Sequence, residues 1–81
     1  MSMKEINIRV LNIINSITNH KQRISLNRVL FLDNLLDSYN VVELIEMLEK
    51  EFSIKIPEIH MTSQNFNTVH NISNLVNLLK K

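Results

Sequence analysis

The sequence predicts an all-α protein, a small four-helix bundle with a short third helix and a long loop between helices one and two. Along three segments apolar residues recur at spacings of three and four, which is the period of one helix face. A residue suited to cap a helix stands before each of these segments. The 81 residues leave room for one domain, which we expect to span residues 1–81.

The first helix is expected to begin after Ser2 and to run to about Thr18. Ser2 and Glu5 have the spacing of a capping box, in which each residue satisfies a backbone N–H of the other. One apolar stripe follows, made of Met3, Ile6, Val10, Ile13 and Ile17. The polar stretch 19–28 ends this pattern. The apolar run 29–36 lacks alternation and a partner strand, so we expect a loop that fills a helical core.

The second helix is expected to begin at Asp37 or Ser38, because either side chain can supply the N-cap oxygen. Its apolar stripe consists of Val41, Leu44, Ile45, Leu48 and Phe52. The helix should end near Phe52. Residues 54–57 are expected to be extended, since the residue before a proline avoids the α region.

A short helical turn is expected at residues 63–66, followed by a last helix that Thr68 caps. The inward side chains of that helix should be Ile72, Leu75, Val76 and Leu79. The three phenylalanines, Phe31, Phe52 and Phe66, are also expected in the core.

The composition excludes several classes of function. Without glycine the chain has no glycine-rich phosphate-binding loop, and without cysteine it has no disulfide, thiolate metal site or thiol nucleophile. Its three histidines are dispersed, so no metal site is expected. No apolar run is long enough to span a bilayer and nothing resembles a signal peptide, so we expect a cytoplasmic protein.

The small net charge of +1 conceals an uneven distribution. Residues 1–28 contain five basic residues and one acidic residue, whereas residues 29–58 contain seven acidic and two basic ones. On the second helix Glu43, Glu46 and Glu49 project away from the apolar stripe. Such charges set the orientation and on-rate of transient partners more than their affinity.

Two further classes find little support in the residues. The basic side chains of the first loop, Lys21, Arg23 and Arg28, have no aromatic residues among them, so no nucleic acid partner is expected. No Ser–His–acid set or pair of carboxylates has a spacing that would assemble a catalytic site. We therefore expect a protein that is not an enzyme.

Five segments in register resemble the acyl carrier proteins and peptidyl carrier domains: residues 30–38, 42–44, 48–52, 54–57 and 65–76. The first of them ends in Asp37-Ser38 at the start of a helix, where that family carries its attachment site. The sequence departs from the family pattern at three positions. Asn34 stands where glycine is usual, Tyr39 stands where Leu or Met normally follows the serine, and Glu46 takes a position that is often apolar.

The resemblance implies a non-enzymatic carrier. A phosphopantetheinyl transferase would attach 4′-phosphopantetheine from coenzyme A to Ser38, and Asp37 would help to position the metal-bound coenzyme. The cofactor brings its own thiol, so a thioester carrier needs no cysteine. Partner enzymes would dock on the second helix, through Tyr39, Val42, Glu43, Glu46 and Glu49.

The expected function is that of a free-standing, monomeric carrier. It would receive an acyl or aminoacyl group from an activating ligase and present it to an acceptor transferase or synthase. Residues 61–66 resemble carriers that work with adenylating ligases, including aminoacyl and D-alanyl carriers. Two alternatives remain open at this point. One is a carrier of primary fatty-acid synthesis, which the basic first helix disfavours, and the other is an unmodified helical adaptor that binds a protein through the same acidic helix.

Overall fold

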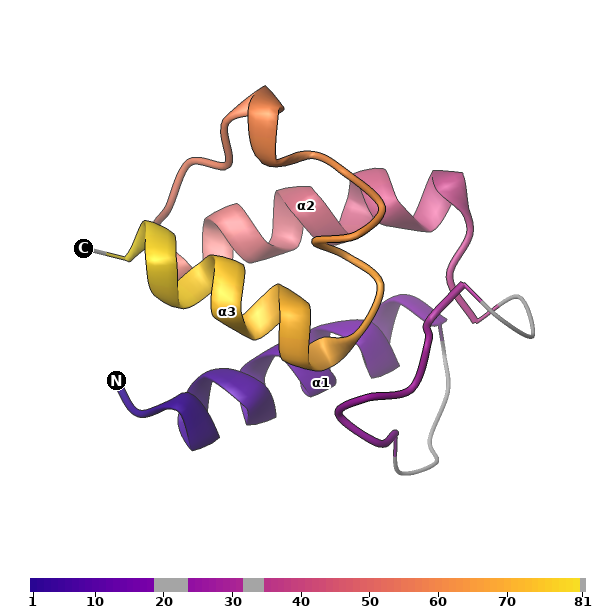
Figure 1. Cartoon of the computed structure of the whole chain (residues 1–81), viewed down its shortest axis with the longest axis horizontal. Coiled ribbons are helices and arrows are strands. Elements are labelled where there is room, and N and C mark those ends of the chain that lie inside the picture. The colour runs from indigo at the N-terminus through magenta and orange to yellow at the C-terminus, as the bar shows by residue number, and fades with distance from the viewer. Residues whose placement is uncertain (19–23, 32–34, 81) are drawn as a thin grey trace.

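The computed structural model describes residues 1–18, 24–31 and 35–80, and within them it contains three α-helices, one 3-10 turn and no strand. The helices are α1 (Met3–Thr18), α2 (Ser38–Phe52) and α3 (Val69–Leu79). The 3-10 turn, η2, spans Glu58–His60. Figure 1 shows the long connection between α1 and α2 at one end of the molecule, and α1 packs against both other helices. The predicted all-α class is confirmed.

Each helix begins at a cap that the sequence predicted. The side-chain oxygens of Ser2, Asp37 and Thr68 each accept the backbone N–H of the residue three positions later, at 3.1, 2.8 and 3.1 Å. A cap of this kind contributes about 1 kcal/mol to helix stability. Because Asp37 is the cap of α2, Ser38 is the first residue of that helix and its hydroxyl is not used as a cap.

The end of α2 uses an unusual residue for its geometry. Ser53 has φ 53° and ψ 47°, which is the left-handed conformation that glycine adopts most easily, but the chain contains no glycine. For a residue with a Cβ this conformation costs about 1–2 kcal/mol. The backbone N–H of Ser53 donates to the carbonyl of Glu49, which satisfies one of the free carbonyls at the helix end. Residues 54–57 are then extended, as predicted.

The short third element lies earlier than expected. Pro57 has φ −64°, and η2 begins directly after it. At residues 63–66 the chain forms turns rather than a helix, with the N–H of Asn65 donating to the Thr62 carbonyl at 3.1 Å. The side-chain amide of Asn65 also donates to the His60 carbonyl at 2.8 Å and so closes the end of η2. The N–H of Phe66 donates to the Ser63 carbonyl at 3.2 Å, so the single helical turn expected at residues 63–66 is present as hydrogen-bonded turns.

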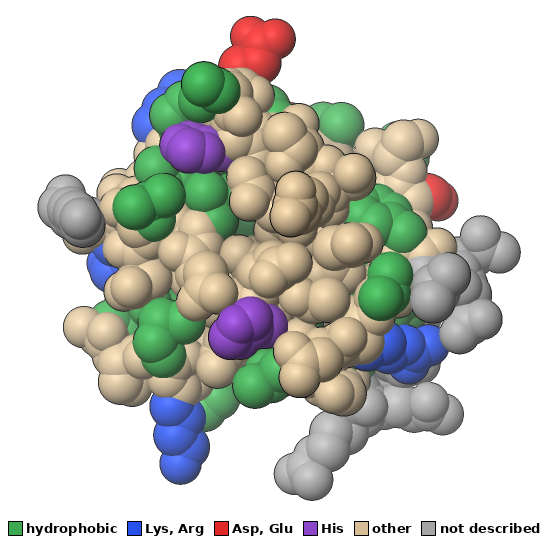
Figure 2. All heavy atoms as spheres, viewed as in Figure 1, with side chains coloured by type: hydrophobic (Ala, Val, Ile, Leu, Met, Phe, Trp, Pro, Cys, Tyr) green, Lys and Arg blue, Asp and Glu red, His purple; other side chains and the backbone are tan. Residues whose placement is uncertain are grey.

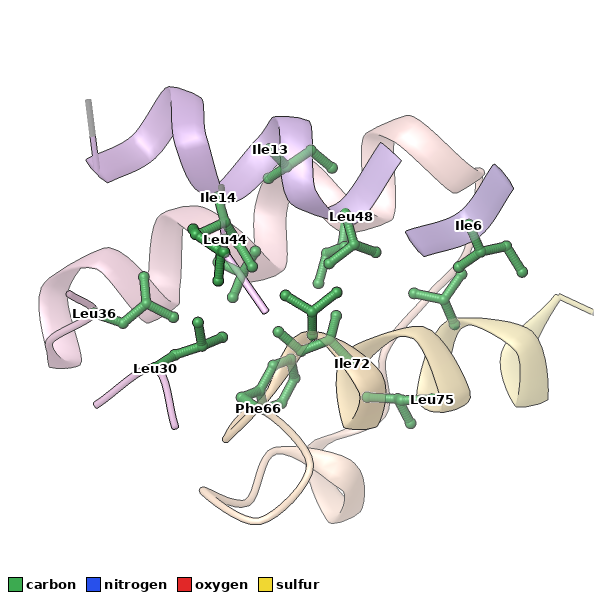
Figure 3. Close-up of a cluster of buried hydrophobic side chains, with 14 of the residues drawn as sticks. Ile6, Ile13, Ile14, Leu30, Leu36, Leu44, Leu48, Phe66, Ile72 and Leu75 are labelled. Carbon is green, nitrogen blue, oxygen red and sulfur yellow. The ribbon is translucent and has the colours of Figure 1, made fainter. Parts of the chain in front are cut away.

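The core is formed by all three helices and by the long connection between α1 and α2. The predicted stripes are buried or partly buried, and Ile14 of α1 is an additional buried residue that the stripe did not include. From the connection Ile24, Leu30, Leu35 and Leu36 are buried. The prediction that the apolar run 29–36 fills the core is thus confirmed for Leu30, Leu35 and Leu36, whereas residues 32–34 lie outside the described residues. Figure 3 shows Leu30 and Leu36 in the same cluster as Leu44 of α2.

Backbone hydrogen bonds tie this connection to the start of α3. The N–H of Leu30 donates to the Asn67 carbonyl at 2.7 Å, and the N–H of His70 donates to the Leu26 carbonyl at 2.9 Å. The N–H of Leu36 donates to the Leu30 carbonyl at 2.8 Å and closes the segment on itself. The residues that lead into α2 are thereby held in place, although Asn34 itself lies outside the described residues.

Candidate functional site

The hydroxyl of Ser38 lies in the open at the beginning of α2. Ser38 and Asp37 are both exposed, and the Asp37 carboxylate accepts the N–H of Asn40 through its Oδ1 atom. The first backbone N–H groups of a helix lack helical partners and form the positive end of its dipole, so this corner favours an anionic group. A modifying enzyme can therefore reach an alcohol that stands next to a favourable place for a phosphate.

A mainly apolar pocket of about 240 Å³ adjoins this serine. We call it the serine pocket; its residues are Phe31, Ser38, Val41, Ile45, Met61, Thr62, Ser63 and Phe66. Its residues come from the first half of α2, from Phe31 before that helix and from the connection between η2 and α3. Figure 1 shows the course of α2 and of that connection.

The serine pocket corrects one prediction about the core. Phe52 and Phe66 are buried as expected, but Phe31 is only partly buried and lines the pocket. Ser63 and Phe66 come from the segment expected to be a helical turn, and Met61 and Thr62 directly precede it; no apolar period there indicated a pocket. Helical periodicity identifies residues that face the core of one bundle, and it gives no signal for a hollow between a helix and a loop.

The predicted docking residues fall into two groups. Tyr39, Val42, Glu43 and Glu46 surround a second hollow of about 400 Å³ on the outside of α2, and we call this surface the α2 face. The side chain of Tyr39 is 76% exposed and that of Val42 is 59% exposed. Among the described residues no ion pair engages Glu43 or Glu46. These four side chains are available to a partner.

Glu49 belongs to the other group. It is half-buried, and its Oε2 accepts the backbone N–H of Ile56 at 2.8 Å. This bond fastens the extended segment to α2, a role that sequence reasoning missed because it depends on where the chain returns after the helix. Further along, Glu51 pairs with Arg9 of α1 at 3.0 Å between Oε2 and Nη1. The freely exposed acids of α2 are therefore concentrated towards its beginning.

The face that carries α3 and the preceding connection has a different character. Figure 2 shows a largely uncharged surface there, with charged side chains near its margins. A hollow of about 410 Å³ on this part of the molecule is lined mainly by amides, including Gln64, Asn71 and Asn74. The amide of Asn71 is occupied, since its Nδ2 donates to the Gln64 carbonyl at 3.0 Å. This face offers little charge to a partner.

The described part of the chain lacks two other kinds of feature. No cluster of three or more His, Cys, Asp or Glu side chains is arranged there to hold a metal ion. Among the same residues no helix combines the length and apolar character needed to cross a bilayer.

The structure thus presents a helical fold with an exposed serine at a helix start, and comparison with known families identifies the class of protein to which the chain belongs. The model of the phosphopantetheine attachment site matches residues 9–79. The chain belongs to this family, since the match covers most of its length. A search of curated proteins found no match.

Family membership establishes the general function. The protein is a carrier that bears a covalent 4′-phosphopantetheine arm, and it is not itself an enzyme. It depends on a phosphopantetheinyl transferase and serves client enzymes. The site fits such a group, because an exposed hydroxyl, a helix start suited to an anion and an apolar hollow lie side by side.

Proposed function

We propose that Ser38 is the residue that carries the phosphopantetheine arm. The supporting observation is the position of its hydroxyl, which is exposed at the first residue of α2, follows the Asp37 cap and borders the serine pocket. Asp37 and Ser38 lie within the matched residues 9–79. When bound, the arm supplies a thiol that carries cargo as a thioester.

The modification is a phosphoryl-type transfer from coenzyme A. The Ser38 oxygen forms a bond to the phosphorus next to the pantetheine, and the bond from that phosphorus to the bridging oxygen of the diphosphate breaks. Adenosine bisphosphate leaves, and a base of the transferase takes the hydroxyl proton. The chain supplies the oxygen nucleophile and a helix start that favours the resulting phosphodiester anion.

Asp37 has a second role in this proposal. Its Oδ1 is engaged with Asn40, and no hydrogen bond within the described residues uses its Oδ2. That oxygen is suited to a divalent cation bound to the coenzyme at the transferase, because carboxylates are the ligands that Mg²⁺ prefers. The same residue would then cap α2 and help to place the phosphate opposite the Ser38 hydroxyl.

Partners are proposed to dock on the α2 face with a basic surface. Glu43 and Glu46 supply the charge, while Tyr39 and Val42 supply apolar contact beside it. A partner guanidinium fits this combination, since it pairs with carboxylates and stacks on an aromatic ring. We assign Glu49 a smaller part in docking, because its carboxylate already binds the Ile56 N–H.

Reversing both charges of the α2 face should slow modification by the transferase. For the double variant Glu43→Lys, Glu46→Lys we expect kcat/KM for transfer to fall about 10-fold or more at low ionic strength, because electrostatic steering is lost. The deficit should shrink in high salt, where surface charges are screened. The measurement is the rate of mass gain by the full chain.

The matched control for this experiment is Glu58→Lys, a charge reversal at an exposed acid of η2 outside the α2 face. The control should retain the wild-type rate. An equal loss in the control and the double variant, or a loss that does not depend on salt, would contradict docking through the α2 face.

The proposed cargo is an acyl or aminoacyl group supplied by an activating ligase and consumed by an acceptor transferase or synthase. The chain is near neutral overall, with a basic first part and an acidic centre. Carriers of primary fatty-acid synthesis are the alternative, and they would be recognised by saturated acyl chains on the isolated protein. Intact-mass analysis of the protein from its native host distinguishes the two by the mass of the cargo.

The attachment is tested by incubating the full chain with coenzyme A and a promiscuous phosphopantetheinyl transferase. We expect a mass gain equal to one phosphopantetheine, and tandem mass spectrometry should place it on the peptide containing Ser38. Placement on another serine would contradict the assignment. Unmodified protein beside a control carrier that is fully modified would also contradict the assignment of Ser38.

A further inference from the structure

We infer that the serine pocket binds the branched, apolar beginning of the arm rather than the cargo at its end. This inference rests on the proposed attachment at Ser38. Ser38 is one of the residues that line the pocket, so the pocket adjoins the residue from which the arm would start. The pocket can therefore hold one of two parts of the loaded arm. One is the segment next to the phosphate, and the other is the cargo, which would reach the pocket only if the arm folded back on itself.

The order of groups along phosphopantetheine decides between these possibilities. After the phosphate come a methylene and a quaternary carbon with two methyl groups, and then a hydroxyl and the first amide. The thiol that carries the cargo lies at the far end. The dimethyl carbon is only four covalent bonds from the serine oxygen, so it reaches a pocket that adjoins Ser38 while the remaining arm points outward.

The walls of the pocket match the chemistry of this segment. Val41 and Ile45 are partly buried, and Met61 is 43% exposed, so apolar surface is left open to water at the pocket. None of the pocket residues is charged, which leaves the phosphate outside at the helix start. Burying the two methyl groups against these side chains removes apolar surface of the arm and of the pocket from water, which is favourable.

Hydroxyl groups of the pocket match the polar atoms that follow. Thr62 and Ser63 are exposed and belong to the same pocket. The Thr62 Oγ1 accepts the N–H of Asn65 at 3.4 Å, so its own proton remains available to donate. The hydroxyl and amide carbonyl that come after the dimethyl carbon are the groups of the arm that these side chains can bind.

The size of the pocket argues against its holding the arm together with a long cargo. Its volume of about 240 Å³ lies below the roughly 300–1,000 Å³ of pockets that enclose a whole small-molecule ligand, so it has room for one segment of the loaded arm. Beyond it the interior is filled, because Phe66 is 2% exposed and belongs to both the pocket and the core cluster with Leu30 and Ile72 (Figure 3). A long chain would have to displace Phe66 from this cluster.

The inference is tested by NMR on the full chain after its mass has confirmed that the arm is attached. We expect nuclear Overhauser contacts from the two arm methyls to the methyl groups of Met61 and Val41, and none from the methylenes next to the thiol. The same contacts should persist when the thiol carries an octanoyl group. Contacts from the octanoyl chain to Met61, or no contacts from the arm methyls, would overturn the inference.

Variants distinguish an effect on the serine pocket from an effect on the whole fold. Val41→Thr and Met61→Gln keep the approximate side-chain size but make the pocket polar, and each should weaken the arm-methyl contacts at least twofold. Ile8→Thr on α1, where Ile8 is 49% exposed and outside the pocket, should leave them unchanged. Equal weakening in the control would overturn the inference. Since the arm is confirmed by mass beforehand, this failure is distinct from a failure of the attachment at Ser38.

Discussion

Replacing Ser38 by alanine should abolish the gain of a phosphopantetheine by the chain and should leave its thermal stability close to that of the wild type. The substitution removes the oxygen that would attack the phosphorus, so phosphopantetheine cannot be transferred to residue 38 even slowly. The fold should not suffer, because Ser38 is exposed and the cap of α2 is Asp37. Alanine is also a good helix former, and exposed substitutions of this kind change stability by about 0.5 kcal/mol or less.

The measurement is intact-mass spectrometry after incubation with coenzyme A and the transferase, together with a thermal unfolding curve. Ser63→Ala is the matched control, because Ser63 is exposed and lines the same pocket but does not begin a helix. The control should gain the full mass. If Ser38→Ala still gained it, or if only Ser63→Ala lost it, the attachment residue proposed here would be wrong.

Replacing Leu44 by alanine should lower the free energy of unfolding by about 2–5 kcal/mol. Leu44 lies at the centre of α2, is fully buried and packs in the common core cluster (Figure 3). Its truncation removes apolar contacts and leaves a cavity that the surrounding helices fill only in part. At about 4–8 °C per kcal/mol for a domain of this size, the unfolding midpoint should fall by roughly 8–40 °C.

Leu78→Ala is the control for this loss, because it makes the same chemical change in a leucine that is 50% exposed on α3. Its effect should stay within about 0.5 kcal/mol. Denaturant unfolding followed by circular dichroism measures both variants. Similar losses in the two would contradict the core position of Leu44, and Leu44→Ala should still be modified at a temperature where it remains folded.

The elements that could be predicted from the sequence are those governed by local rules. The spacing of apolar residues in α1, α2 and α3 reports directly which side faces a core, and the caps Ser2, Asp37 and Thr68 mark where each helix begins. The segment 54–57 is extended as predicted, for a reason that lies in the proline that ends it. These features need no knowledge of the tertiary arrangement.

The features that were missed depend on how distant segments meet. Glu49 has the sequence signature of a surface acid, and only the return of the chain past α2 brings the Ile56 N–H to it. Phe31 has the composition of a core residue, yet the path of the connection leaves it at the edge of the serine pocket. The family pattern indicated Ser38, but the hollow beside it arises from packing that no short motif records.

The pairing of α1 with α3 has a consequence for how the chain acquires its shape. These helices are the earliest and latest elements described, yet they pack directly against each other. Ile6 and Val10 of α1 are fully buried in the folded chain, so we expect α1 to lack part of its apolar cover during synthesis until α3 has left the ribosome. Bringing α1 and α3 together closes a long loop, and the chain loses conformational entropy before the contacts between the two helices form. We therefore expect the bundle to fold only after α3 has been translated. Ser38 would reach its position at the start of the packed α2 only at that stage.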